Sequence, residues 1–454
     1  MLQLFDTAKG GVVPLETREP GKVSMYVCGP TVYGPPHIGH GRFSLVFDVI
    51  RRYLEWSGVE VTYVSNITDI DDKIIARAAR EDRDWREIAA RCEAVWYRAM
   101  DALDVRRPDR DPHATAYVDD MVALVGRLVE RGVAYETSDG VYFQAERVDD
   151  YGLLARQPLD SLRAGARVEA GEEKRSPVDF ALWKKAKPGE PSWPSPWGDG
   201  RPGWHTECVV MSLDLLGEGF ELHGGGQDLA FPHHENERAQ AVADGKRFAT
   251  RWVHNGFVEV EGTKMSKSLG NTINLVDLVE RYDPRAYRLL VLRSHYRAPI
   301  DVTDDSLRDA EAALARLDAF ARRVAAAGVD APAAVPDPDA IDRFRQAMDD
   351  DLRTQVATAL AFDLVREANA ALDAGDEAGA APKAAAALEI VGALGLELRA
   401  GAAEVPDEVA AWARERDEAR AERDWARADA LRDRITGAGY VVEDTPGGTV
   451  VRPG

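Results

Sequence analysis

The chain has 454 residues, of which 45% are hydrophobic and 30% charged; this composition is typical of globular proteins and excludes collagen-like, coiled-coil and disordered chains. The length predicts three or four domains at roughly 100–200 residues each. The formal net charge of −21 argues against indiscriminate nucleic-acid binding, which depends on neutralising phosphates, but not against a selective nucleic-acid partner bound by local basic patches.

The first third of the chain has the pattern of an α/β unit. Val23–Val27 is β-prone, and glycine and proline punctuate the residues after it. An amphipathic helix is predicted from about Gly39 to Trp56, and Val59–Val64 is the next β-prone segment. Strand, helix and strand in this order predict a parallel sheet with a right-handed crossover. Residues 71–103 have helical periodicity.

Residues 118–204 have a different texture, rich in glycine, proline, tryptophan and arginine, and we interpret them as an insertion between two halves of the sheet domain. The α/β pattern returns from residue 205. From about 305 the chain is almost entirely helical, with predicted linkers at 325–339 and 373–383. Residues 406–436 predict either a pair of charged helices or one long helix, and residues 439–451 predict a small hairpin.

Localisation follows from what the sequence lacks. No apolar run approaches the roughly 18 residues of a membrane span, and no secretory signal is visible in residues 1–21. Three cysteines are too few for a disulfide framework in so long a chain. We therefore expect a cytoplasmic protein that does not bind membranes and whose reduced cysteines are free to bind metal.

The tetrapeptide His37-Ile38-Gly39-His40 lies where the first loop meets the first predicted helix. A helix N-terminus attracts anions through its free N–H groups and dipole. His37 and His40 are three residues apart, face one way on the first turn and add donors for phosphate oxygens. Gly39 lacks the Cβ that would block a nucleotide base. The alternative for the tetrapeptide alone is a pair of surface histidines near a turn.

A second motif, Lys264-Met265-Ser266-Lys267-Ser268, lies on a loop bounded by glycines. Two lysines three residues apart on such a loop can reach one triphosphate and stabilise the charge that develops on departing pyrophosphate. A lone pair of lysines at this spacing is common on surfaces. Together with the HIGH tetrapeptide, however, the KMSKS pentapeptide resembles the signature pair of class I aminoacyl-tRNA synthetases.

Potential metal ligands are spread along the sequence. Cys28 follows the first predicted strand, and Cys208 lies far downstream. His233 and Glu237 are four residues apart, which on a helix places them on one face. Two thiolates, an imidazole and a carboxylate suit zinc. The alternative is that the cysteines are inert core residues, and this is our expectation for Cys92, which lies within a predicted helix.

Further segments resemble the cysteinyl-tRNA synthetase family from the first residue to the last. The similar segments are CGPTVY (28–33), NITDIDDK (66–73), DFALWK (179–184), RPGWH (201–205), HGGGQD (223–228), WVHNGF (252–257) and YVVEDTPGGT (440–449). The resemblance implies an α/β fold in which a Rossmann-like parallel-sheet catalytic domain carries an inserted connective domain and is followed by a helical bundle. The implied domains are a catalytic domain in two halves (1–117 and 205–250), a connective insertion (118–204), a KMSKS-bearing stem-contact region (251–305), a helical bundle (306–393) and a small C-terminal anticodon-binding domain (394–454).

The resemblance also implies an activity and its partners. The family activates L-cysteine with ATP and Mg²⁺ to cysteinyl-adenylate and transfers the cysteine to tRNA-Cys, with monomer as the expected state. One zinc per chain would bind the substrate as a thiolate, which serine cannot match at neutral pH. The implied site residues are His37, His40, Lys264 and Lys267 for catalysis; Gly39, Asp228 and Lys267 for ATP; Thr68, Trp204, His223 and His254 for the amino acid; and Cys28, Cys208, His233 and Glu237 for zinc.

Several alternatives stay open at this stage. Four protein ligands exceed the three that most catalytic zinc sites have, so either the ion becomes five-coordinate with substrate or Glu237 loosens. The sequence departs from the family pattern at Thr206, usually aliphatic, and at 353–355, where Arg-Thr-Gln replaces Asn-Thr-Pro. Other candidate functions are the ligase that joins cysteine to glucosaminyl-inositol in mycothiol synthesis and a non-catalytic zinc- or nucleotide-binding paralogue. Arginines between 414 and 434 predict either a basic stripe for tRNA or an ion-paired solvated helix.

Overall fold

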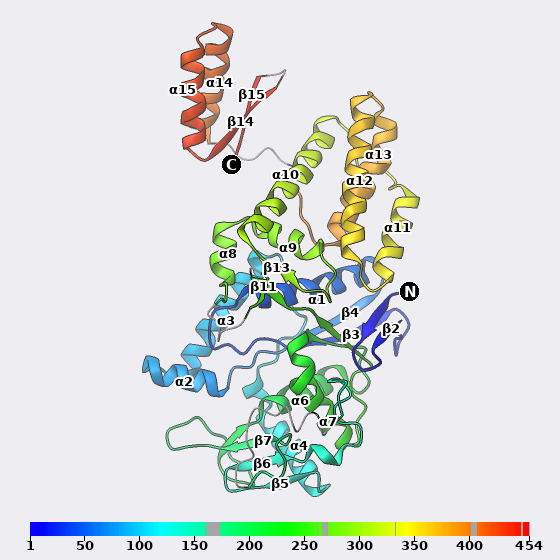
Figure 1. Cartoon of the computed structure of the whole chain (residues 1–454), viewed down its shortest axis with the longest axis vertical. Helices are drawn as coiled ribbons and strands as arrows, with labels where there is room; N and C mark the ends of the chain where they lie inside the picture. The colour runs from blue at the N-terminus through cyan, green and yellow to red at the C-terminus, as the bar shows by residue number, and fades with distance from the viewer. Residues whose placement is uncertain are drawn as a thin grey trace.

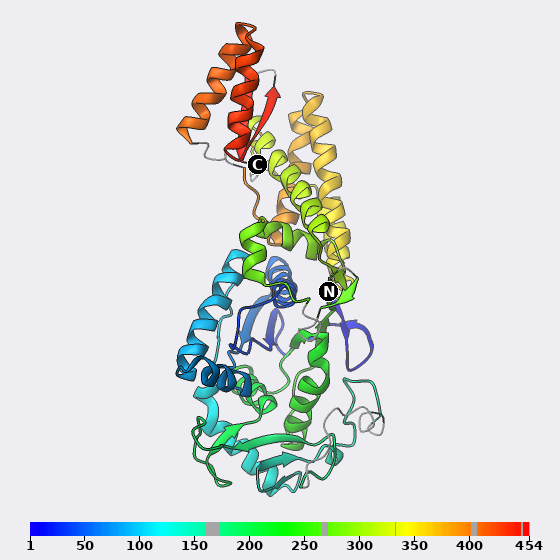
Figure 2. The same ribbon diagram turned by 60° about the vertical axis from the view of Figure 1, so that its left-hand side comes forward.

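A parallel sheet lies at the centre of the protein, with a helical bundle and a C-terminal unit towards one end and a second sheet towards the other (Figure 1). The computed structural model describes residues 1–158, 161, 173–260, 262–265, 271–331, 333–400, 406–445 and 448–453. Figure 2 shows the same succession of parts from a second direction. Within these ranges no helix combines the length and the apolar character that a membrane crossing requires.

The central sheet confirms the predicted strand–helix–strand unit. Its strands are β10 (Arg251–Asn255), β9 (Leu222–Gly226), β3 (Lys22–Val27) and β4 (Glu60–Ser65), in that order and all parallel. Helix α1 (Ile38–Trp56) connects β3 to β4. Its Phe47 lies against Gly224 of β9, where an added Cβ would come within 2.2 Å of the Phe47 ring. The glycine therefore lets α1 pack closely on the sheet.

Strands β3 and β9 are neighbours although the inserted antiparallel sheet lies between them in the sequence. In open parallel sheets the change of strand order at such a point leaves a crevice at the carboxyl ends of the strands, where ligands bind. Helices α6 (Trp204–Leu216) and α7 (Glu235–Ala243) begin beside this crevice and pack against each other. An N-terminal hairpin, β1 (Gln3–Asp6) and β2 (Gly11–Pro14), lies against β10.

Residues 71–103, for which the sequence indicated one continuous stretch of helical periodicity, form two separate helices. They are α2 (Asp72–Glu81) and α3 (Trp85–Ala102). Asp82 adopts a left-handed conformation with φ of 50°, which ends α2. Asp84 then accepts a hydrogen bond from the backbone N–H of Arg86 and caps the start of α3. Periodicity alone does not show this break because both helices present apolar faces to the same neighbourhood.

Between the two halves of the central sheet, the chain forms an antiparallel sheet. Helix α4 (Val118–Glu130) precedes the strands β5 (Ala134–Glu136), β6 (Gly140–Phe143), β7 (Phe180–Lys185) and β8 (Gly200–Pro202), which pair in that order. Asp72 of α2 forms ion pairs with Lys184 of β7 and Arg201 of β8. These contacts attach the inserted sheet to the region below the crevice.

The segment that follows β10 in the sequence packs against α1. It comprises β11 (Val258–Val260), β12 (Thr263–Lys264), α8 (Leu275–Arg281), α9 (Pro284–Leu292) and β13 (Ile300–Asp301). The guanidinium of Arg42, buried in α1, donates to the backbone carbonyls of Phe257, Tyr296 and Ala298. Arg42 thereby connects the helix that bears the HIGH motif to the strands that carry the KMSKS loop.

The bundle comprises α10 (Asp304–Ala326), α11 (Pro338–Asp349), α12 (Thr354–Asp373) and α13 (Glu377–Ala393). The predicted linker at 325–339 corresponds to the connection between α10 and α11. The predicted linker at 373–383 is wrong beyond residue 376. Asp376 caps α13 by accepting from the N–H of Gly379, and the helix continues through Pro382 because its alanines bury against α12.

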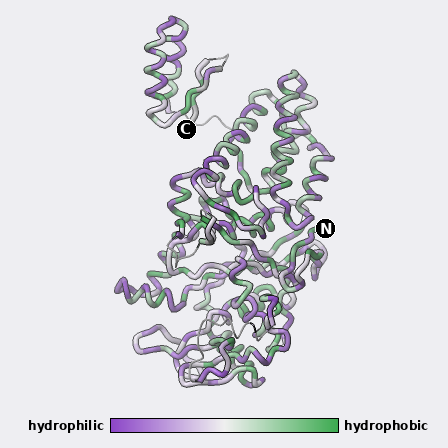
Figure 3. Tube along the Cα trace, in the orientation of Figure 1, coloured by the Kyte–Doolittle hydropathy of each residue, from purple (hydrophilic) through white to green (hydrophobic). Residues whose placement is uncertain are grey.

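The C-terminal unit confirms a pair of helices and a hairpin. Helices α14 (Asp407–Ala421) and α15 (Trp425–Gly437) pack on β14 (Tyr440–Thr445) and β15 (Gly448–Pro453), and hydrophilic residues recur along both helices (Figure 3). Arg416 is buried and donates to Asp444 at 2.6 Å and to Thr449 at 2.7 Å. Arg420 also pairs with Asp444. These two arginines hold the hairpin, so they do not form part of an exposed basic stripe.

Candidate active site and metal centre

A cavity of about 340 Å³ opens at the carboxyl end of β3, beside the N-terminus of α1. Its walls contain members of each set of residues singled out from the sequence. They are Cys28, Cys208 and His233 of the metal set, His37, Gly39, His40 and Asp228 of the ATP and catalytic sets, and Thr68 and Trp204 of the amino-acid set. The fold thus brings to one cavity side chains that are far apart in the sequence.

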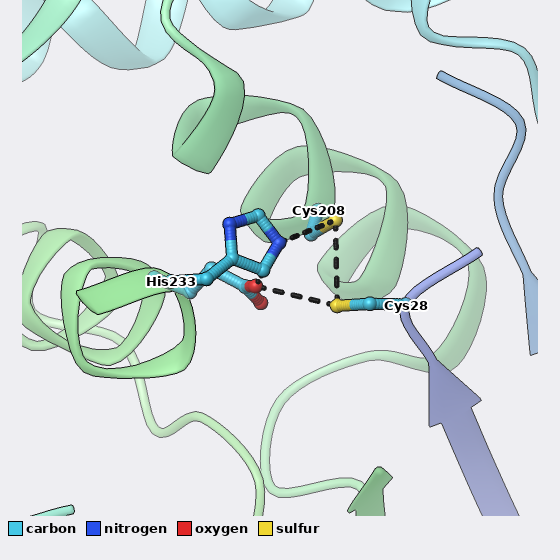
Figure 4. A group of neighbouring side chains, drawn as sticks. Cys28, Cys208 and His233 are labelled. Atoms are coloured by element: carbon cyan, nitrogen blue, oxygen red, sulfur yellow. Dashed lines mark hydrogen bonds and ion pairs between the residues drawn. The ribbon is translucent and has the colours of Figure 1, made fainter. Parts of the chain in front are cut away.

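The four proposed metal ligands lie close together and are all buried, and Figure 4 shows three of them, Cys28, Cys208 and His233. Cys28 Sγ lies 3.7 Å from Cys208 Sγ and 3.4 Å from Glu237 Oε1. His233 Nε2 lies 3.7 Å from Cys208 Sγ and 2.9 Å from Glu237 Oε1. His233 lies in a π-helical turn (Ala230–His234) that leads into α7, so the predicted contact across four residues is kept although the helix is irregular.

The charges in this cluster are strongly coupled. Burial opposes ionisation of Glu237, but His223 and His233 hold the pKa of its carboxyl well below the ordinary value. Burial likewise disfavours charge on His233, yet Glu237 and Cys208 raise its pKa to about 10. Burial and the neighbouring Cys208 raise the pKa of the Cys28 thiol. Three potentially anionic groups around one point form a site that a metal cation can stabilise.

The HIGH motif places two stacked imidazoles at the N-terminus of α1. The rings of His37 and His40 have centroids 3.7 Å apart and planes 16° apart. His40 Nδ1 accepts from the backbone N–H of His37 at 3.1 Å, so the ring proton of a neutral His40 lies on Nε2. Burial lowers the pKa of both histidines, that of His40 well below its ordinary value. Both rings are therefore neutral N–H donors near pH 7.

Gly39 lies between the two histidines and leaves the cavity open. A Cβ at this position would approach the His37 ring to 2.9 Å and the Met265 methyl group to 3.1 Å. Any side chain there would fill the space between the HIGH helix and the start of the KMSKS segment. Packing of His37 and Met265 therefore already favours a glycine at this position, and the passage of a nucleotide base beside it stays a prediction.

Trp204 and Thr68 form the other side of the cavity. The Trp204 indole stacks on the His233 imidazole, with centroids 4.0 Å apart. The Thr68 hydroxyl accepts from Asn66 Nδ2 at 3.2 Å and donates to Glu207 Oε2 at 2.7 Å. Burial raises the pKa of Glu207 well above its ordinary value. The wall beside the metal ligands therefore consists of an aromatic ring and a satisfied polar network.

His223 and His254 lie behind the cavity wall. His223 is fully buried and its Nε2 lies 2.6 Å from Glu237 Oε2. His254 contacts His234 at 2.9 Å and the Thr7 hydroxyl at 2.7 Å, and it borders a second cavity of about 1,110 Å³ under the inserted sheet. His223, His234, Cys28 and Glu237 also form a set of close donors, which shares Cys28 and Glu237 with the first set.

The two lysines of the KMSKS motif are only partly covered by the structure. The backbone of Lys264 pairs with Glu259 in the hairpin of β11 and β12, while its side chain and the whole of Lys267 lie outside the described residues. Met265 borders the cavity. The first residue of the KMSKS motif, Lys264, therefore lies in the β11–β12 hairpin, and the second, Met265, lies at the edge of the cavity.

Sequence reasoning gave no role to several residues of the site. Asn66 Oδ1 accepts from the backbone N–H of Gly29 at 2.9 Å, and Lys73 borders the cavity. His205 and Glu207 lie between Trp204 and Cys208 on α6. Asn66, Lys73 and His205 lie inside the segments that carry the family resemblance, whereas Glu207 lies outside them. Thr206, at a position usually aliphatic, is buried and bonded to Gln240 of α7 at 2.9 Å.

The sheet with its switch-point crevice, the HIGH helix and the KMSKS hairpin define a class I tRNA synthetase. A family model described as tRNA synthetases class I (C) catalytic domain matches residues 14–312. A DALR domain matches residues 343–399, and a cysteinyl-tRNA ligase anticodon binding domain matches residues 402–452. The chain belongs to the cysteine–tRNA ligase family.

Curated relatives and solved structures agree with this assignment. The chain is 48% identical to the cysteine–tRNA ligase of Thioalkalivibrio sulfidiphilus, with 100% of both chains covered, and 45% identical to that of Geobacter metallireducens, with 99% of both covered. A Mycobacterium tuberculosis methionyl-tRNA synthetase, solved with methionyl-adenylate, is similar in fold. Its TM-score is 0.60 at 18% identity, covering 82% of this chain and 89% of that one.

Proposed function

We propose that this protein joins L-cysteine to tRNA-Cys in two ATP-dependent steps and that a bound zinc ion selects the substrate by its thiol. The observation that carries the proposal is one cavity bordered both by Cys28, Cys208 and His233 and by the HIGH helix. A small amino acid can therefore place its side chain at the metal ligands and its carboxylate at the nucleotide site.

Cys28, Cys208, His233 and Glu237 are a donor set that would suit a zinc ion. With Zn–S near 2.3 Å and Zn–N near 2.0 Å, ligand atoms lie roughly 3.3–3.8 Å apart. The separations of 3.4–3.7 Å that involve sulfur match this range. His233 and Glu237 are closer, at 2.9 Å, as expected for a direct ion pair. Zinc would supply a soft Lewis acid that binds a thiolate in preference to a hydroxyl.

Such chemistry is needed because cysteine and serine have nearly the same shape. Apolar contacts separate near-isosteres by only about 10–200-fold. The residues of this chain create the preference by holding two thiolates, a carboxylate and an imidazole around one point. Trp204 stacks on the imidazole of His233 beside that point. The family resemblance assigns His223 and His254, with Thr68, to the amino-acid pocket. The position of His223, 2.6 Å from Glu237, supports an additional role in orienting this ligand.

In the first step the cysteine carboxylate attacks the α-phosphorus of ATP, giving cysteinyl-adenylate and releasing pyrophosphate. The substrate is its own nucleophile, so no side-chain nucleophile is required. We assign His37 and His40 to donate N–H bonds to phosphate oxygens, Gly39 to admit the base, and Asp228 to bind the ribose. Lys264 and Lys267, with Mg²⁺, would stabilise the charge on the departing pyrophosphate.

In the second step a hydroxyl of the terminal ribose of tRNA attacks the carbonyl carbon of the adenylate, and AMP leaves. The match of residues 402–452 to a cysteinyl-tRNA ligase anticodon binding domain supports tRNA as the acceptor and disfavours the glucosaminyl-inositol ligase. We expect a monomer that acts in the cytoplasm.

An acceptor assay tests this function. The wild-type protein is incubated with ATP, Mg²⁺ and radiolabelled cysteine, with tRNA-Cys in one sample and glucosaminyl-inositol in another. Label that appears in acid-precipitable tRNA, and not in glucosaminyl-inositol, supports the proposal. Label transferred to glucosaminyl-inositol, or pyrophosphate exchange that responds equally to serine, would contradict it.

A further inference from the structure

The proposed metal ligand His233 is bonded on its far side to a second imidazole. His205 Nδ1 lies 2.8 Å from His233 Nδ1. The other ring nitrogen of His233, Nε2, faces Cys208 and Glu237. His205 lies on the first turn of α6, three residues before Cys208. Helix α6 therefore carries both the proposed metal ligand Cys208 and His205, which is the hydrogen-bond partner of the ligand His233.

Only one proton can occupy the contact between the two nitrogens. A metal bound at His233 Nε2 requires the lone pair of that atom, so a neutral His233 must carry its proton on Nδ1. His205 Nδ1 must then be the acceptor, and a neutral His205 carries its own proton on Nε2. The 2.8 Å contact is compatible with this arrangement and with no other in which both rings are neutral and Nε2 is free.

Neighbouring rings limit the ways in which the two imidazoles can turn. Trp204 stacks on His233 with 24° between the planes. Phe180 of the inserted sheet meets His205 edge-on, with centroids 5.5 Å apart and planes 86° apart. The hydrogen bond thus joins two rings whose orientations are already restricted, which is the arrangement expected of a partner that orients a metal ligand.

We propose that His205 is a positioning residue for the metal site: it accepts the Nδ1–H of His233 and so holds His233 in the tautomer and orientation that leave Nε2 free for the ion. The inference rests on the proposed function, because it assumes that these residues bind zinc. His205 itself touches neither the ion nor the reacting atoms.

A neutral acceptor suits a site that must admit another anion. Two thiolates and one carboxylate already exceed the charge of a divalent ion. The commoner carboxylate partner of a metal-bound histidine would add a further negative charge beside the incoming substrate thiolate. His205 orients the ligand without that charge.

Two variants separate the hydrogen bond from ring packing. His205→Phe keeps a ring against Phe180 but has no acceptor. His205→Asn loses the ring but places Oδ1 near the position of Nδ1. Each purified, substrate-free protein is loaded with zinc, and release of the ion to a chromophoric chelator is followed. We expect H205F to release zinc about 10–100-fold faster than the wild type, and H205N to stay within a few-fold of it.

The visible spectrum of the cobalt-loaded proteins provides a second readout that does not depend on activity. We expect H205F to shift the cobalt bands and H205N to retain them. Equal release rates and spectra for H205F and wild type would overturn the inference. H205N behaving like H205F would also overturn it, since an acceptor placed at this position would then fail to hold the metal site. A wild-type protein that binds no zinc would refute the proposed function itself, and this result is distinguishable from the others.

Discussion

The indole of Trp204 lies against the imidazole of His233, with 4.0 Å between ring centroids, and yet Trp204 is 38% exposed. A ligand of the proposed metal site is therefore covered by a side chain that also borders the cavity. The stacking restricts the His233 ring on one side. The exposed part of the Trp204 indole borders the cavity and can contact a ligand bound there.

Replacing Trp204 by alanine should raise the KM for cysteine in pyrophosphate exchange. An aromatic contact of this kind is worth about 0.5–1.5 kcal/mol, which corresponds to roughly 2- to 13-fold, and the KM for ATP should change less. Trp425→Ala is the matched control, because Trp425 is 60% exposed on α15 and remote from the cavity. An unchanged KM for cysteine in W204A would show that the indole does not shape the amino-acid pocket.

Removing one thiol from the cluster should abolish metal binding and cysteine activation together. Cys208→Ser replaces a thiolate by a neutral hydroxyl, a poor ligand for zinc. Zinc per chain, measured by atomic emission, and pyrophosphate exchange should both fall. Cys92→Ser is the control, since Cys92 is buried between α2 and α3 beside Arg77. A metal-free C208S protein with full activity is the outcome that would exclude the zinc site.

The residue pairs within the two signature motifs and the pair His233 and Glu237 could be proposed because their spacing is local. Cys28 and Cys208, 180 residues apart, could be assigned to one site with them only through the family resemblance. His37 and His40 share a helical turn, and His233 and Glu237 share a helix face. The role of Glu207 could not be predicted, because its partner Thr68 is 139 residues away in the sequence. Burial of His223 behind Glu237 likewise depends on strand β9 meeting α7, which no sequence pattern specifies.

The fold shows the same division. Periodicity identified β3, α1 and β4, whose alternation and length are unambiguous. It missed the break at Asp82, because a single left-handed residue leaves the apolar period almost unchanged. It also placed a linker across Pro382, where burial of neighbouring alanines keeps the chain helical despite the proline. Tertiary packing outweighed local propensity at that position.

Lys267→Ala should slow adenylate formation by roughly 10²–10³-fold in kcat, because its charge is proposed to act on the transition state. The KM for cysteine should stay near the wild-type value. Lys246→Ala provides a matched control, since Lys246 forms an exposed ion pair with Glu218. Pre-steady-state measurement of adenylate formation gives the rate directly. A K267A rate equal to that of wild type would remove this lysine from the mechanism.

Asp72 should contribute a pH-dependent part of the stability. Burial would raise its pKa, but Lys184 and Arg201 lower it to about 2, below the ordinary value for an aspartate. A depressed carboxyl pKa adds stability above about pH 4, and this stability is lost as the pH falls towards 2. Asp72→Asn should therefore unfold at lower urea than wild type at neutral pH. The difference should shrink in acid, and a difference that grew below pH 4 would contradict the ion-pair account.

A chain ending at residue 400 should separate the two steps of the reaction. Leu394 and Leu396 are buried in the core shared with the bundle, so truncation after them should leave the site intact. Pyrophosphate exchange with cysteine should persist, while charging of tRNA-Cys should fall strongly because the anticodon contacts are lost. Full charging by the truncated chain would show that residues 401–454 do not bind tRNA.

X-ray absorption at the zinc edge tests most directly the claim that a metal bound by Cys28, Cys208, His233 and Glu237 selects the substrate thiolate. The spectrum of the free protein should fit two Zn–S bonds near 2.3 Å. Addition of cysteine should raise the fitted number of sulfur ligands to three, and addition of serine should leave it at two. A sulfur count that stays at two with saturating cysteine would contradict the account.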